Sequence, residues 1–218
     1  MSEGATHRKV KEYIARALQA TPGVTNVVLE QHFGPVRADV SFLLRDKHGA
    51  IELQLSDKPL ALIDERTRRY HELGIHVLWV LHDAEETLCA GSRLVSSDWE
   101  EYLHALYFGV VYHWAGGQEL QPVYLERRQN LYRRYFDSEQ GRWDSPLYKQ
   151  ICTCWLLDQT RITDLLPVIR QPKQVGQYTL PAAHLWCLPR STLKEAHQKQ
   201  YTFMDEWRWR VFAPPAQE

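Results

Sequence analysis

The stretch that most constrains this chain is residues 37–56, RADVSFLLRDKHGAIELQLS. It predicts two strands joined by a polar turn around residues 46–49. Because side chains alternate between the two faces of a strand, the apolar residues fall on one face of this hairpin. The opposite, polar face carries the remaining residues of the two strands: Arg37, Asp39, Ser41, Glu52, Gln54 and Ser56. The pattern therefore predicts that two acids, Asp39 and Glu52, meet with Gln54 beside them.

Two carboxylates in one partly buried place need compensation. Burying both is costly unless a cation or a proton shares the site. An oxygen-ligand site for Mg²⁺ or Mn²⁺, with Asp39 and Glu52 as ligands, would remove that cost. The alternative is an amphipathic hairpin whose polar face simply contacts water.

The residues after the hairpin predict a helix and a buried strand. Residues 57–73 have helical periodicity, and Gly74 ends that helix. The run IHVLWVL at residues 75–81 is continuously apolar, as expected of a strand that is buried on both faces. The predicted order is strand, strand, helix, strand.

This order, with acids at these points, resembles the core of the PD-(D/E)XK nucleases. The segments RADV, IELQLS, ERTRRYHELG and HVLWVL are similar to the competence protein CoiA-like branch of that superfamily, over roughly residues 5–83. The resemblance implies an α/β fold with an αβββαβ core. It also implies a metal-dependent nuclease that acts on DNA during uptake, recombination or repair, with Asp39, Glu52 and Gln54 at its catalytic positions. Glu30 is a further candidate catalytic residue from its place on the preceding strand.

The first helix, predicted over residues 7–19, bears on which further acid completes the site. Glu12 falls nearly opposite the apolar stripe of this helix, so we interpret it as a surface acid. His7 and Lys11 flank the stripe and resemble the His and Lys of CoiA-like proteins, which implies that they border the active site. Glu30 lies on the strand predicted over residues 25–33, where it either supplies the missing acid or pairs with Arg37 across the strands.

Gln54 departs from the superfamily pattern, in which this position holds a lysine. Glutamine cannot take up a proton at neutral pH and can only hold a water or phosphate oxygen by hydrogen bonds. CoiA-like sequences also carry Glu-x-Gln here.

On the following helix, Arg66 and Tyr70 share one face and resemble the family's R-x-x-x-Y element. Arg66 is expected to meet a phosphate or an acid of the site.

The resemblance does not clearly extend past residue 83. We therefore expect a nuclease-like core over residues 1–94 and an accessory α+β region of unknown role over residues 95–218. In that region the sequence predicts a helix that begins after Ser97, a hairpin formed by GVVYHW and QPVYLER, a helix from Ser145 to about Leu157, and a closing strand over residues 201–212.

One segment of the accessory region is basic and aromatic. Its arginines alternate with tyrosines that include Tyr124, Tyr132 and Tyr135. Such a segment suits single-stranded nucleic acid, and the alternative is an ordinary solvated surface. The arginines are Arg127, Arg128, Arg133 and Arg134.

Composition limits where in the cell we expect the protein, how it contacts DNA and whether it binds zinc. The net charge is −1, so contacts with DNA must come from local clusters. The four cysteines are not in paired CxxC spacing, and we expect reduced thiols and no zinc site. No apolar run approaches 18 residues and no signal peptide is evident, so we expect a cytoplasmic protein without membrane contact.

Two rival functions remain open from the sequence. One is a non-catalytic module on a nuclease fold, which binds single-stranded or branched DNA or a recombination protein without cutting. Gln54 and the absence of a helix glutamate favour it. The other is a purely structural protein in which the acids pair with Arg37 and Arg66.

Overall fold

The computed structural model describes residues 4–54, 59–82, 93–95, 97–127, 135–137, 142–144 and 151–194. The chain divides into two compact units, Met1–Cys187 and Leu188–Glu218. Of the second unit, residues 188–194 are described. The sheet and the helices that build the site belong to the first unit.

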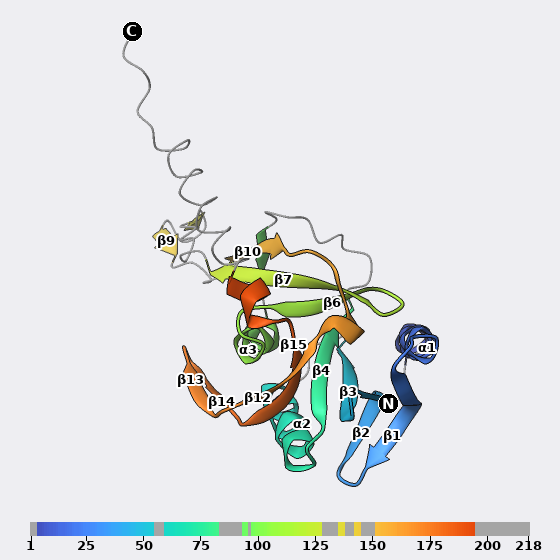
Figure 1. The fold of residues 1–218 in the computed structure, drawn as a ribbon. Helices are drawn as coiled ribbons and strands as arrows, with labels where there is room; N and C mark the ends of the chain where they lie inside the picture. Colours follow the sequence, from blue (N-terminus) through green and yellow to red (C-terminus); the bar gives the residue numbers. More distant parts are fainter. Residues whose placement is uncertain are drawn as a thin grey trace. The chain divides into compact units, whose positions relative to one another are not determined.

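The first part of the chain follows the order helix, three strands, helix, strand (Figure 1). Strands β1 and β2 pair antiparallel, β2 and β3 pair antiparallel, and β3 and β4 run parallel. The α/β class and the αβββαβ core are thereby confirmed. The elements are α1 (Ala5–Gln19), β1 (Val24–Phe33), β2 (Val36–Leu44), β3 (Lys47–Gln54), α2 (Leu60–Glu72) and β4 (His76–Leu81).

The central hairpin, β2–β3, has a tighter turn than the sequence predicts. Its two turn residues are Arg45 and Asp46, with φ of 52° and 58°. Positive φ at both positions is the geometry of a type I′ turn, which matches the twist of antiparallel strands. The polar residues Lys47 and His48 therefore already belong to β3, where they pair with the end of β2.

In the rest of the first unit, most of the described strands join the same sheet, while β8 with β9 and β13 with β14 form separate antiparallel pairs. One more helix lies beside the sheet. The helix, α3, begins at the predicted place: Ser97 and Glu100 form a reciprocal capping box. The elements are β5 (Arg93–Val95), α3 (Asp98–Leu106), β6 (Val111–Gly116), β7 (Glu119–Arg127), β8 (Tyr135–Asp137), β9 (Arg142–Asp144), β10 (Ile151–Leu156), β11 (Thr160–Arg161), the 3-10 turn η1 (Ile162–Asp164), β12 (Leu166–Arg170), β13 (Lys173–Val175), β14 (Tyr178–Leu180) and β15 (Ala183–Cys187).

Strand β4 is the centre of the sheet, and all six of its residues are buried. One edge of β4 pairs with β3 along its full length. The other edge is divided: β15 pairs with it at Val77, and β6 pairs with it at Val80 and Leu81. Strands from distant parts of the sequence thus complete the core, as the order of colours around β4 in Figure 1 shows.

The hydroxyl of Tyr107 bonds to the backbone of β4 between the residues that pair with β15 and with β6. The Trp79 N–H donates to the hydroxyl of Tyr107 at 2.9 Å, and that hydroxyl donates to the Val77 carbonyl at 3.0 Å. Tyr107 is itself fully buried, directly after α3. One side chain therefore bonds to two backbone groups of β4, at residues 77 and 79.

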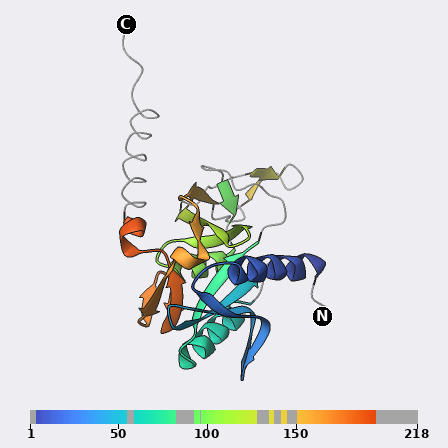
Figure 2. The same cartoon turned by 45° about the vertical axis from the view of Figure 1, so that its right-hand side comes forward.

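Helix α1 packs against β1 and β2, while α2 contacts β4, β15 and β2 (Figure 2). Among the described residues, no helix has the length and apolar character needed to cross a bilayer. Strands from both sides of residue 94 belong to one sheet. The division that we expect at residue 94, between a nuclease-like core and an accessory region, therefore stays a prediction about sequence families and function.

One predicted element is wrong. Ser145 and Pro146 indicate a helix that reaches about Leu157, but residues 151–156 form strand β10, which pairs with β5 and β7. A local capping signal carries no information about strand partners elsewhere, and pairing with β7 decides this segment. Residues 145–150 and the closing strand predicted over residues 201–212 lie outside the described residues.

Candidate active site

Asp39 and Glu52 lie where β2 and β3 part from each other. The backbone pairing of the two strands extends as far as Val40 and Ile51. Beyond this point a side chain replaces the backbone as acceptor: Oδ2 of Asp39 accepts the N–H of Leu53 at 2.8 Å. The two acids therefore come from adjoining positions on neighbouring strands, as the alternation of the sequence predicts.

Helix α1 supplies the positive groups around Asp39. Nε2 of His7 lies 3.3 Å from Oδ2, and Nζ of Lys11 lies 3.7 Å from Oδ1. Burial acts to raise the pKa of Asp39, but the hydrogen bonds from His7 and Leu53 and the charges of His7 and Lys11 outweigh it. The net effect lowers the pKa of Asp39, so this acid is held in its charged form.

Helix α2 supplies the groups around Glu52, which is almost completely buried. Arg66 and Tyr70 both donate to the same carboxylate oxygen, Oε1. Burial, which is the largest influence, and the nearby charge of Asp39 raise the pKa of Glu52 to about 7, although Arg66 and Tyr70 act in the opposite direction. Glu52 therefore changes its protonation near neutral pH, while its neighbour stays charged.

Arg66 joins the two strands as well as contacting Glu52. Its Nη2 also donates to the backbone carbonyl of Arg37 on β2 at 2.9 Å. Thr67, one residue further along α2, accepts from the indole N–H of Trp79 at 3.2 Å and donates to the Ile63 carbonyl at 2.7 Å. The bond from Trp79 holds α2 against β4 and so helps to set the position of Arg66 and Tyr70.

Glu30 pairs with Arg37, which is one of its two predicted roles, and also with Lys11, which the sequence does not suggest. Lys11 forms an ion pair with Oε1 of Glu30, and Nε of Arg37 lies 2.9 Å from Oε2. Since Lys11 also lies near Asp39, a single ammonium group connects Glu30 with Asp39. Glu12 lies elsewhere: its side chain is 43% exposed and its partner is Arg16, one turn along the same helix.

Gln54 is the last residue of β3 and is buried, with Leu81 of β4 as its partner in the parallel register. It lies two residues after Glu52 on the same strand, so the two side chains share one face. An amide at this point can donate and accept hydrogen bonds but cannot accept a proton at neutral pH.

The structure brings most of the predicted site residues together, whereas the arginine cluster falls outside the side chains that it describes. His7, Lys11, Arg37, Arg66 and Tyr70 all contact Asp39, Glu52 or Glu30, or a group bonded to them. Of the four predicted arginines, Arg127 ends β7, and its side chain is not among those described. The other three, Arg128, Arg133 and Arg134, lie outside the described residues.

Sequence reasoning did not single out Thr67 and Tyr107 as supports of the site. Thr67 does stand in the predicted apolar stripe of its helix, and a hydroxyl in such a stripe is a usable signal for an internal hydrogen bond. Tyr107 gives no signal of this kind, because its two partners lie on a strand that the local sequence cannot identify.

The donor set fits a hard divalent cation that keeps much of its water. Asp39 and Glu52 offer carboxylate oxygens, and Arg66 and Tyr70 both contact Oε1 of Glu52. In the described part of the chain, no three or more His, Cys, Asp or Glu side chains gather so as to hold a metal ion. Mg²⁺ is commonly held by one or two carboxylates together with water and substrate phosphates, which is compatible with this pair.

Comparison with known proteins gives one family and one distant structure. The family described as "Competence protein CoiA, nuclease-like domain" matches residues 3–102. No curated protein matches the chain. Among solved structures, the SPO1766 protein of unknown function from Silicibacter pomeroyi aligns with 100% of this chain and 98% of its own, at 15% identity and a TM-score of 0.29. At that score the likeness says nothing about the fold or the site.

Proposed function

Residues 3–102 belong to the nuclease-like domain family of competence protein CoiA, and from this premise we propose that the protein is a metal-dependent nuclease that acts on DNA. The cellular setting that we propose is DNA uptake, recombination or repair. The observation that carries the proposal is the pair of Asp39 and Glu52 at the point where β2 and β3 separate, with a basic residue from each of two helices beside them.

Asp39 and Glu52 would hold the metal ion, Mg²⁺ or Mn²⁺. When bound, such an ion would activate a water and stabilise the charge that develops on a phosphate. The protonation of the two acids suits different parts of this task. The pKa of Asp39 is lowered, which favours its charged form, whereas Glu52 must give up a proton near pH 7 before it can bind a cation.

The surrounding residues would bind and orient the substrate. Lys11 and Arg66 carry positive charge next to the two acids, and a phosphate oxygen could replace an acid as their partner.

Gln54 would hold a water or a phosphate oxygen by hydrogen bonds. We therefore expect Gln54→Lys to preserve or raise the rate of cutting and Gln54→Ala to lower it, measured as cleavage of linear DNA. Loss of all activity in Gln54→Lys with metal binding intact would contradict this role.

The second candidate is a non-catalytic module that binds DNA or a recombination protein. The observation that favours it is that each acid already has basic partners: His7 and Lys11 for Asp39, and Arg66 for Glu52. These ion pairs compensate the buried charge without a metal. In this case the acids would hold α1 and α2 on the sheet, and DNA would bind without being cut.

One experiment separates the two candidates. Wild type, Asp39→Asn and Glu52→Gln are compared for cleavage of single-stranded and branched DNA with Mg²⁺ or Mn²⁺, and for Mn²⁺ binding by calorimetry. Glu72→Gln is the matched control, because Glu72 is an exposed acid on α2 that pairs with Arg69. A nuclease loses cleavage and Mn²⁺ binding in the first two variants only. If wild type binds DNA but neither cuts it nor binds Mn²⁺, the non-catalytic module is correct.

A further inference from the structure

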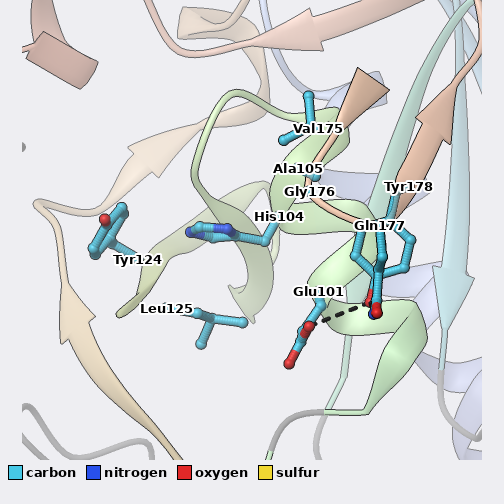
Figure 3. Close-up of a pocket in the computed structure, with 9 residues that line it drawn as sticks. All are labelled: Glu101, His104, Ala105, Tyr124, Leu125, Val175, Gly176, Gln177 and Tyr178. Atoms are coloured by element: carbon cyan, nitrogen blue, oxygen red, sulfur yellow. Dashed lines mark hydrogen bonds between the residues drawn. The ribbon is translucent and has the colours of Figure 1, made fainter. Parts of the chain in front are cut away.

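A cavity lies away from Asp39 and Glu52, between α3, β7 and the hairpin of β13 and β14 (Figure 3). Its volume is about 250 Å³. Pockets for drug-sized ligands hold about 300–1,000 Å³, so this one suits a single ring system rather than a large molecule. It belongs to the same compact unit as the candidate active site.

An acid that is itself buried lines this cavity. Glu101 of α3 is 9% exposed, and the hydroxyl of Tyr178 donates to its Oε2 at 3.2 Å, as the dashed line in Figure 3 shows. A carboxylate offers acceptor sites on both oxygens and can accept several hydrogen bonds at once. The bond from Tyr178 is therefore compatible with further N–H donors from a ligand.

Apart from Gly176 and the amide side chain of Gln177, flat rings and apolar side chains form the rest of the wall. The ring centroids of His104 and Tyr124 lie 5.1 Å apart, with the rings tilted by 60°. Leu125 lies next to Tyr124 on β7, and Val175 lines the cavity from β13. Aromatic rings and an apolar wall favour a planar ligand that can stack, and Glu101 favours one with N–H donors on its edge.

We propose that this cavity binds one unpaired guanine base of a single-stranded nucleic acid; the proposal rests on the nuclease function proposed above and adds a base preference to it. Guanine presents two adjacent N–H donors on its Watson–Crick edge, at N1 and N2, which match a single carboxylate. Cytosine and adenine place an acceptor nitrogen beside their exocyclic amine, and thymine has carbonyls on both sides of its N–H. Each of these three bases would direct an acceptor at Glu101.

The sequence supports the same ligand class independently of the cavity. Tyr124 is the first aromatic residue of the basic and aromatic segment that suits single-stranded nucleic acid. A base read on its Watson–Crick edge and stacked on aromatic rings is the common mode by which proteins recognise unpaired nucleotides. In this proposal, Tyr124 is one of the aromatic rings on which the guanine base stacks.

Binding to short oligonucleotides tests the proposal without any need for cleavage. The full chain is titrated in EDTA with a fluorescent oligothymidylate that carries one central guanine, adenine, cytosine or thymine. We expect the guanine oligonucleotide to bind about tenfold more tightly than the others, which is within the discrimination of a two-donor contact. Glu101→Gln should lose this preference, because its amide group presents a donor to the guanine edge. Glu72→Gln, an exposed acid on α2, should keep it.

A second variant guards against misfolding of Glu101→Gln. Ala105→Phe adds a ring to a residue that lines the cavity and leaves Glu101 and Tyr178 in place, so it should also remove the preference. Equal affinity for all four oligonucleotides in wild type, or an unchanged guanine preference in both variants, overturns the proposal. A guanine preference without any cleavage would overturn the nuclease alone. Cleavage that depends on Asp39 without any base preference would overturn the cavity's role alone.

Discussion

Glu52 and Asp39 are adjacent acids with opposite pKa shifts, because their surroundings differ. Asp39 accepts hydrogen bonds from His7 and from a backbone N–H, which lower its pKa. Glu52 is more deeply buried and feels the charge of Asp39, which raises its pKa to about 7. Environments that separate the pKa values of two neighbouring carboxyls are typical of acids with different roles.

This shift makes the stability of the metal-free protein depend on pH through Glu52. Between its ordinary pKa of 4.5 and about 7, the folded protein binds the Glu52 proton more strongly than the unfolded chain does. The contribution of Glu52 to the free energy of unfolding is therefore complete below pH 4.5 and lost as the pH rises through 7. Glu52→Gln should remove this fall, as measured by urea unfolding in EDTA from pH 4.5 to 8.

The comparison with Glu52→Gln is necessary because a histidine acts in the opposite direction. Burial lowers the pKa of His76 to about 4, so its contribution to stability is present above pH 6.5 and lost as the pH falls. The measured quantity is thus the difference between wild type and Glu52→Gln at each pH. A difference that does not change with pH would show that Glu52 is not the titrating group.

At the scale of the elements, α1 contributes its inner face to the site through Lys11, which lies between Glu30 and Asp39. We expect Glu30→Gln to weaken Mn²⁺ binding and cleavage. Without the negative charge of Glu30, the ammonium group of Lys11 pairs with Asp39 and competes with the metal. The measurements are Mn²⁺ calorimetry and the rate of DNA cleavage.

Glu12→Gln is the matched control on the same helix, since Glu12 pairs with Arg16 and is part-exposed. It should leave metal binding and cleavage as in wild type. If Glu12→Gln is the inactive variant, the metal ligand comes from α1 and our assignment of the helix face is wrong.

Tyr107 connects α3 to the central strand, and its removal should cost stability. Tyr107→Phe leaves the N–H of Trp79 and the carbonyl of Val77 without the hydroxyl between them. A buried polar group that loses its partner costs about 1–3 kcal/mol. We expect urea unfolding to show a loss of that size, whereas Tyr13→Phe, at an exposed tyrosine of α1, should be nearly neutral. Equal stability of Tyr107→Phe and wild type would show that another group satisfies β4.

The sequence predicts the elements whose signals are local. Alternation places Asp39 and Glu52 on one face of the hairpin, and helical spacing places Arg66 and Tyr70 together. It misses β10, because the capping signal of Ser145 is local whereas the pairing of Cys154 with Leu125 is not. It also leaves Glu30 between two interpretations, since only the packing of α1 decides that Lys11 reaches it.

At the scale of the whole molecule, the nuclease-like segment depends on strands that follow it in the sequence. Residues 3–102 match the family, yet β4 pairs with β6 and β15, which both lie after that segment. A fragment of residues 1–102 would leave one edge of a fully buried strand unpaired. Such an edge pairs readily with other chains.

We therefore expect the fragment of residues 1–102 to aggregate or remain unfolded, and a fragment of residues 1–194 to fold. Circular dichroism and size-exclusion chromatography of the two fragments make the comparison. A soluble, cooperatively folded fragment of residues 1–102 would show that β4 does not need β6 and β15, and would support a self-contained domain that ends near residue 94.

The pairing of Val77 with Leu185 also has a consequence for the order of events during translation. Asp39 and Glu52 leave the ribosome well before β15, the strand that pairs with β4 at Val77. Contacts between residues so distant in sequence form slowly, because a long loop must close first. A nascent chain would thus expose its acids long before it could hold them in place, so any nuclease activity would begin only after β15 has been synthesised.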